Sequence, residues 1–350
     1  MAHYEDYEGL KYIMEQKWDT HKDEFPSNKG DYVQHYKKIE DFLNEKFHPE
    51  VNIGAAASGD VLTDHGADHV QMVIRYAFKL LENGKCEELK GYEIFILLLA
   101  IHFHDVGNIS GRDKHESKII NIMNELGNIV LLDTVEKRFI TDIAVAHGGI
   151  VYGSISDKDT LKLLQQSENC NGIKIRPAML ASILRFADEL SDDNTRAKRF
   201  VNIENKNNIY HEYSKSLSPI TFSGKTIEFA FNIEYTLSIR KIPINDTEDY
   251  LYDEILRRLK KCMCELEYCR KYSEGFIDIT NLSIEVNVLD KENNIRRPKC
   301  FKFTLRLSGY PNINEIDIES LITEQSGIEY RNGESLKKVI EDTTTIEEKV

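Results

Sequence analysis

Six residues in the middle of the chain have the types and the order needed to hold divalent metal ions. They are His69, His104, Asp105, His115, His147 and Asp188. Four imidazoles and two carboxylates without a thiolate suit Mn, Fe, Ni, Co or Zn better than Ca, and Mg remains a candidate. Two ions about 3.5–4 Å apart that share one carboxylate can deprotonate a water and neutralise a phosphoryl oxygen. We therefore expect two bound ions and hydrolysis of a phosphate ester or anhydride.

Two of these residues end the most apolar stretch of the chain. The run IFILLLAIHFHD extends from Ile94 to Asp105 and is broken only by His102. It is long for a typical strand and too short for a membrane span, so it predicts a buried helix. A buried carboxylate costs several kcal/mol unless a cation or a hydrogen-bond partner compensates it. This cost supports metal binding at His104 and Asp105, whereas His102 should face away and serve in core packing or a hydrogen bond.

The other candidate ligands also lie on or at the ends of predicted helices. The segment HVQMVIRYAFKLLENG places His69 on an apolar face, and His115 opens HESKIINIMNEL. A further helix from about Asp133 ends at His147, and PAMLASILRFADELSDD brings Asp188 to the border of an apolar stripe. Several helices that each direct an imidazole or carboxylate toward one core form metal sites in helical bundles.

Two basic residues beside these motifs could compensate the charge of a phosphate. Lys114 adjoins His115, and Arg185 precedes Asp188 by almost one helical turn. We expect catalytic roles for these two basic residues together with Asp105 and His115.

The composition restricts the partners of the chain. Its 350 residues are 41% hydrophobic and 30% charged, with a formal net charge of −14. Nonspecific binding to nucleic acid or anionic membrane needs clustered Lys and Arg, so long nucleic acid and membrane partners are not expected. The acidic N-terminus lacks a signal-peptide pattern, no apolar run has membrane length, and the six cysteines form no CxxC pair. These features predict a cytoplasmic protein with reduced thiols.

The pattern of the chain predicts a mainly α protein, with a helical core followed by a smaller α+β C-terminal region. Residues 1–60 should form an N-terminal helical extension, with an irregular loop from His48 to Asp64 where Pro and Gly gather. Residues 61–200 should form the helical metal-binding domain. Residues 201–350 contain strand-like runs around a helix from about Thr247 to Tyr272. This α+β domain carries no motif that assigns it a role.

Five motifs in order resemble the signature of the HD-domain metal-dependent phosphohydrolase superfamily. They are TDHGADHVQMV, HFHDVGN, DKHESKI, AHGG and RFADELSD. The resemblance implies that His69, His104, Asp105 and Asp188 bind the first metal. It also implies that His115 and His147 complete a second site, with Asp105 as the bridging carboxylate. Many members with two metals have adjacent histidines where this chain has His147-Gly148.

The resemblance also suggests the substrate. It implies a nucleotide, with a (deoxy)nucleoside triphosphate as the leading candidate, and a cyclic (di)nucleotide phosphodiesterase is the closest alternative. A di-iron oxygenase and a non-catalytic nucleotide-sensing module remain open. The motifs also resemble HD domains found beside bacterial ATPase or defence modules, which suggests a defence or signalling setting. Helical HD proteins often assemble, so a homo-oligomer is possible, although no interface can be read from the sequence.

Overall fold

The computed structural model describes residues 9–27, 30–57, 66–82, 85–110, 115–148, 151, 157–192, 209–244, 247–289, 295–306, 317–326 and 332–347. The chain divides into two compact units, which are described separately. The first unit comprises Met1–Ser191 and Cys269–Asp278. The second comprises Asp192–Tyr268 and Ile279–Val350.

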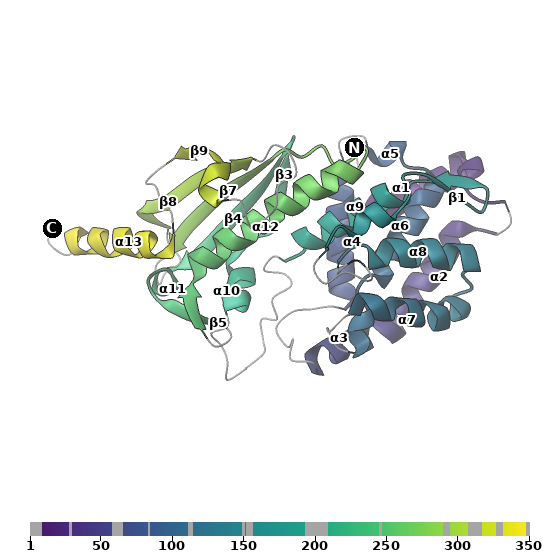
Figure 1. Cartoon of the computed structure of the whole chain (residues 1–350), viewed down its shortest axis with the longest axis horizontal. Helices are drawn as coiled ribbons and strands as arrows, with labels where there is room; N and C mark the ends of the chain where they lie inside the picture. Colours follow the sequence, from purple (N-terminus) through teal and green to yellow (C-terminus); the bar gives the residue numbers. More distant parts are fainter. Residues whose placement is uncertain are drawn as a thin grey trace. The chain divides into compact units, whose positions relative to one another are not determined.

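The first unit is built from helices, which Figure 1 colours from purple to teal. Its principal α-helices are α1 (Gly9–Thr20), α2 (Tyr32–Phe42), α3 (His48–Ala57), α4 (Ala67–Leu81), α6 (Gly91–Phe103), α7 (His115–Ile129), α8 (Thr134–Val145) and α9 (Pro177–Leu190). The short elements are η2 (Lys22–Glu24), α5 (Lys85–Glu88), η4 (Val106–Ser110), η5 (Thr160–Leu163) and the antiparallel pair β1 (Glu168–Cys170) and β2 (Ile173–Ile175). The helical core predicted for this region is confirmed.

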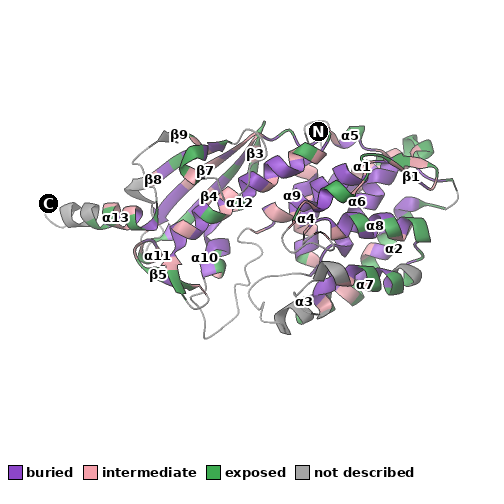
Figure 2. Ribbon diagram, in the orientation of Figure 1, coloured by how far each residue is buried: buried purple, intermediate pink, exposed green. Residues whose placement is uncertain are grey.

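Helix α6 lies at the centre of this unit and packs against α1, α2, α4, α8 and α9. All of its residues are buried, and Figure 2 shows it in purple. The predicted buried helix that ends in a His-Asp pair is therefore confirmed. Within the described residues, the stretch Gly91–Ile109 is long and apolar enough to cross a membrane, but it is almost entirely buried within the protein. This stretch is therefore buried inside the first unit.

The prediction of an irregular loop from His48 is wrong, because residues 48–57 form α3. A π-helical turn, η3 (Leu43–Phe47), joins α2 to α3, and the His48 N–H bonds to the carbonyl of Leu43 five residues back. Proline in an α-helix clashes with the carbonyl four residues earlier. The wider π turn directly before Pro49 changes this hydrogen-bond pattern and lets the helix continue. Residues 58–64 of the predicted loop lie outside the described residues.

The second unit is α+β, as predicted. Its five-stranded sheet has the order β3 (Thr221–Ser223), β4 (Thr226–Glu234), β7 (Asn281–Leu289), β8 (Ile295–Arg306) and β9 (Ile322–Ser326). Strands β4 and β7 are parallel, and the other neighbours are antiparallel. The remaining elements are α10 (Ile209–Ser216), α11 (Tyr235–Ile239), β5 (Lys241–Ile244), β6 (Thr247–Tyr250), α12 (Leu251–Tyr272), η7 (Ile318–Leu321) and α13 (Gly333–Glu347).

Helix α12 follows one face of this sheet (Figure 1), and the ring of Tyr252 lies 5.7 Å from that of Phe301 on β8. The prediction that this helix begins near Thr247 is wrong by one turn. Thr247–Tyr250 instead forms β6, which pairs with β5. Tertiary pairing thus overrides the local pattern at the start of the helix.

Candidate metal centre

Two imidazoles and two carboxylates converge at the C-terminal end of α6. They belong to His69, His104, Asp105 and Asp188, here called the four-residue cluster. The Nε2 atom of His69 lies 3.2 Å from Nε2 of His104 and 3.3 Å from Oδ1 of Asp188. The Oδ2 atom of Asp105 lies 3.4 Å from Nε2 of His69 and 3.7 Å from Nε2 of His104. Sequence periodicity predicts this convergence of three helices, and the structure places all four residues together.

These separations suit a common ion. Nitrogen and oxygen donors bind a divalent transition ion at about 2.0–2.2 Å, so neighbouring donors around one ion lie about 3.0–3.5 Å apart. The donor atoms of His69, His104 and Asp188 all lie within 4.8 Å of one another. The imidazole side chains are 0% exposed, whereas those of Asp105 and Asp188 are 12% and 27% exposed. The cluster is thus closed on its imidazole side and accessible to water on its carboxylate side.

Each ligand is delivered by the end of a helix. His69 is the third residue of α4, His104 caps the C-terminal end of α6, and Asp188 lies in the last turn of α9. The Nδ1 atom of His104 donates a 2.7 Å hydrogen bond to the carbonyl of Ile101. This bond fixes the tautomer in which Nε2 carries the lone pair for a metal.

The electrostatics of the cluster favour a positive charge at its centre. Burial alone would lower the pKa of His104, but the carboxylates of Asp105 and Asp188 outweigh it and raise the pKa to about 9. Burial would raise the pKa of Asp188, but its hydrogen bonds with His104 and His69 hold it well below the ordinary value. Two partly buried carboxylates that face two buried imidazoles are thus stabilised by a cation, which either a proton or a metal ion can supply.

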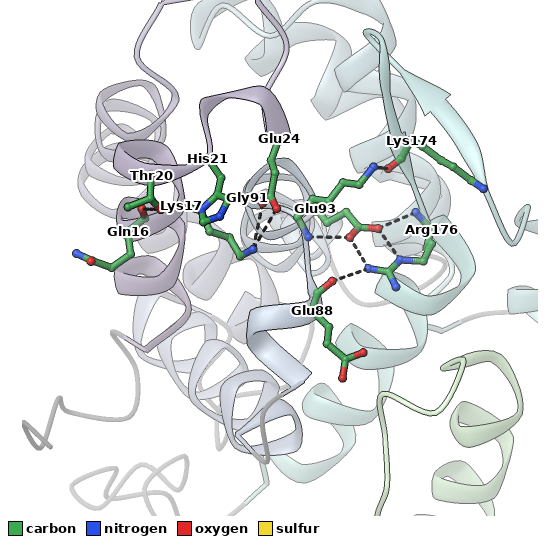
Figure 3. Close-up of polar contacts among 11 residues, drawn as sticks. Gln16, Lys17, Thr20, His21, Glu24, Glu88, Gly91, Glu93, Lys174 and Arg176 are labelled. Atoms are coloured by element: carbon green, nitrogen blue, oxygen red, sulfur yellow. Dashed lines mark hydrogen bonds and ion pairs between the residues drawn. The ribbon is translucent and has the colours of Figure 1, made fainter.

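The N-terminal ends of α6 and α9, opposite the ends that carry the cluster, are joined by hydrogen bonds (Figure 3). Arg176, at the N-cap of α9, donates from Nε and Nη2 to the two carboxylate oxygens of Glu93, at 2.8 and 2.6 Å. Glu93 lies in the first turn of α6 and also accepts from the backbone N–H of Lys90. The backbone N–H of Gly91 donates to Glu24 at 2.7 Å. These bonds satisfy the otherwise orphaned N-terminal donors of α6 and fix it relative to α9.

His147 lies beside the cluster. It follows α8 by two residues, it is buried, and its ring contacts that of His104 edge-on at 5.0 Å between centroids. Its Nδ1 atom donates to the carbonyl of Ala144, which again leaves Nε2 with the lone pair. This position suits the predicted second ion, and the number of ions stays a prediction.

Of the predicted basic and catalytic residues Arg185, Lys114 and His115, the structure describes the side chain of Arg185. Arg185 is buried and donates from Nη1 to Thr160 Oγ1 at 3.0 Å, and Thr160 Oγ1 donates to the carbonyl of Ala146. Arg185 thereby joins α9 to the residue before His147, and its role toward phosphate stays a prediction. His115 is the first residue of α7, but its side chain lies outside the described part of the structure, as does Lys114.

Sequence reasoning missed one residue that supports the cluster directly. Ser191 is fully buried, and its Oγ donates to the carbonyl of Asp188 at 2.7 Å while lying 3.4 Å from Nδ1 of His69. It therefore ends α9 and orients an imidazole of the cluster. Its position one turn after Asp188 was the only signal available in the sequence.

A second missed group is a chain of buried polar side chains behind α6. His102 faces away from the cluster, as predicted, and its two ring nitrogens lie 3.1 Å from His48 Nε2 and from the Tyr36 hydroxyl. The Tyr36 hydroxyl donates to Glu40, which forms a 2.5 Å ion pair with Lys11. His102 has a pKa lowered by burial, so it is neutral and can donate only once. The donors then run in one direction, from His48 through His102 and Tyr36 to Glu40.

The helical fold and the His-Asp cluster together define an HD-type domain. A family model described as HD-CE matches residues 59–261, which is more than half of the chain. The chain therefore belongs to the HD-CE family. The matched segment contains the whole four-residue cluster and ends within α12. No match was found among curated proteins or among solved structures. An HD-type domain with this cluster indicates a metal-dependent hydrolase.

Proposed function

We propose that the protein is a metal-dependent phosphohydrolase acting on a nucleotide, with a (deoxy)nucleoside triphosphate as the leading substrate. The observation that carries the proposal is the convergence of two buried imidazoles and two carboxylates, with donor separations of 3.2–3.7 Å. The residues fit divalent ions such as Mn, Fe, Ni, Co, Zn or Mg.

When bound, such an ion activates a water and compensates charge on a phosphoryl oxygen. The protein supplies position. His69 and His104 present Nε2 lone pairs, and Asp105 and Asp188 present carboxylates on the side that water can reach. His147 stands where it can complete a second site. Arg185 lies one turn before Asp188 and places a permanent positive charge in this region.

The substrate class rests on the resemblance to HD phosphohydrolases and on the charge balance. With a net charge of −14, the chain attracts a polyphosphate only where ions and basic side chains reverse the local field. A nucleotide is small enough to use one such site, whereas a long nucleic acid is not. We further propose a cytoplasmic location, where nucleotides are available.

The test compares the wild type with Asp105→Ala. Metal content is measured by elemental analysis, and turnover is measured by chromatography on a panel of dNTPs, NTPs and cyclic dinucleotides. Asp105→Ala should lose both bound metal and hydrolysis, because one of four donors to a buried cation is gone. Asp41→Ala, which removes an exposed carboxylate from α2, is the control.

The products separate the candidate substrates. Release of phosphate, pyrophosphate or triphosphate from dNTPs or NTPs supports the leading substrate. Linear products from cyclic dinucleotides would instead assign a phosphodiesterase. Full activity in Asp105→Ala would refute the site.

A further inference from the structure

Asn108 is a buried polar residue whose side chain forms no hydrogen bond with the described residues. It is 1% exposed, and within the described part of the chain neither its Nδ2 nor its Oδ1 has a hydrogen-bond partner. A buried carboxamide without partners is costly, and such groups in folded proteins usually serve a bound water, ion or ligand. Asn108 differs in this respect from Asn171 of the same unit. Asn171 donates to Asp133 and to the Tyr92 hydroxyl.

The backbone places Asn108 one turn after Asp105 of the four-residue cluster. Asn108 lies in the 3₁₀ helix η4, three residues after Asp105, and its N–H donates to the Asp105 carbonyl at 3.0 Å. In a 3₁₀ turn the side chains at positions i and i+3 eclipse each other. Because this i, i+3 hydrogen bond joins the two residues, we expect the carboxamide of Asn108 on the same face of the turn as the Asp105 carboxylate, whose Oδ2 lies 3.4 Å from Nε2 of His69.

The turn itself does not need this side chain. A backbone hydrogen bond closes the turn, so the carboxamide is not used as a cap. An apolar side chain of similar size would fill the same volume without leaving polar atoms unpaired. The sequence instead carries a group with one acceptor and two donor hydrogens.

We propose that Asn108 positions the reacting groups, with Nδ2 donating to a phosphoryl oxygen of the substrate and Oδ1 accepting from the attacking water. This inference rests on the proposed phosphohydrolase function. A carboxamide is suited to the task because it can donate and accept at once. It also adds no charge to a site that already holds two carboxylates.

The experiment uses the full-length chain loaded with Mn²⁺ and inorganic phosphate as the probe. Calorimetry measures the Kd for Mn²⁺ and then the Kd for phosphate in wild type, Asn108→Leu and Asn108→Asp. Asn287→Leu is the matched control, because Asn287 is also buried with an unpartnered Oδ1 but lies in the sheet of the second unit. Thermal unfolding of each variant shows whether it is folded.

Asn108→Leu should bind phosphate about 10- to 100-fold more weakly, the loss of one hydrogen bond to a charged group, with unchanged Mn²⁺ affinity and no loss of thermal stability. Asn108→Asp should weaken phosphate binding at least as much, because it replaces the N–H donor by a negative charge. Asn287→Leu should leave both affinities unchanged.

Three results would overturn this assignment. Wild-type phosphate affinity in Asn108→Leu would show that the carboxamide does not reach the substrate. A parallel loss of Mn²⁺ affinity would show that it only supports the cluster. If the wild type and Asn108→Leu hydrolyse nucleotides equally well, the Asn108 proposal alone is refuted. If the Mn²⁺-loaded wild type neither binds phosphate nor hydrolyses nucleotides, both proposals are refuted.

Discussion

Replacing Arg176 by methionine should destabilise the first unit strongly, because it removes the cation from a buried ion pair. The Glu93 side chain is 1% exposed and that of Arg176 is 23% exposed. Arg176 gives Glu93 two side-chain hydrogen bonds, at 2.8 and 2.6 Å, and its guanidinium lies 4.6 Å from the ring centroid of Phe276. Methionine keeps much of the apolar stem but leaves the carboxylate without a counter-charge.

The expected loss follows from what remains around the carboxylate. Breaking a buried pair by removing one partner costs about 3–5 kcal/mol. Two backbone donors, from Lys90 and from residue 176 itself, would still reach Glu93 in the variant. We therefore expect the lower end, about 3 kcal/mol, which corresponds to a decrease in Tm of about 6–12 °C for a unit of this size.

The assay can report on this unit alone. Trp18 is the sole tryptophan of the chain and lies on α1, with its ring 5.1 Å from that of Phe25. Urea unfolding followed by tryptophan fluorescence therefore measures the first unit. Adding Glu93→Gln completes a double-mutant cycle, and the double variant should recover part of the loss because no buried charge is left unpaired. A loss below about 1 kcal/mol for Arg176→Met would show that the pair acts like an exposed one, and would refute the reasoning.

Three further predictions concern other parts of the first unit. Gly91→Ala should cost about 1–3 kcal/mol in urea unfolding, because an added Cβ would lie 2.2 Å from the Phe25 ring, whereas Gly30→Ala meets nothing within 4 Å and should be neutral. Burial raises the pKa of Glu40, but its hydrogen bonds and the charge of Lys11 outweigh burial and lower the pKa to about 2. The stabilisation from Glu40 is therefore complete above pH 4.5 and is lost as the pH falls toward 2, so Glu40→Gln should flatten the dependence of unfolding free energy on pH in that window. Ser191→Ala should weaken Mn²⁺ binding about tenfold by calorimetry, and an unchanged Kd would remove the serine from the support of the cluster.

Local patterns could predict the elements that carry the cluster. All faces of α6 are buried, so the run from Ile94 to Asp105 is apolar at almost every position. Its composition alone therefore indicates a buried helix. Periodicity placed His69 and Asp188 on inward faces of α4 and α9, and buried polar groups on such faces require a partner. The residue types and the helical periodicity therefore indicate the same inward-facing residues without any long-range contact.

Long-range pairing could not be predicted in the same way. The order of the sheet, in which β4 pairs in parallel with β7 across an intervening α12, depends on contacts that a single sequence does not encode locally. Residues 322–326 form β9 because they complete the sheet beside β8. The importance of Asn108 could not be predicted from the sequence either, because only the structure shows that its side chain has no hydrogen-bond partner among the described residues.

The π turn lets two side chains of the N-terminal helices reach the same residue of α6. Tyr36 and His48 are twelve residues apart, which in a regular α-helix would place them about 120° apart around the axis. One extra residue in the turn at η3 reduces that angle to about 20°, so both side chains lie on one face. That face meets His102, which bonds to both of them two residues before His104. A shift of this register would separate either Tyr36 or His48 from α6. The irregular turn at residues 43–47 thus positions the helix that carries the His-Asp pair.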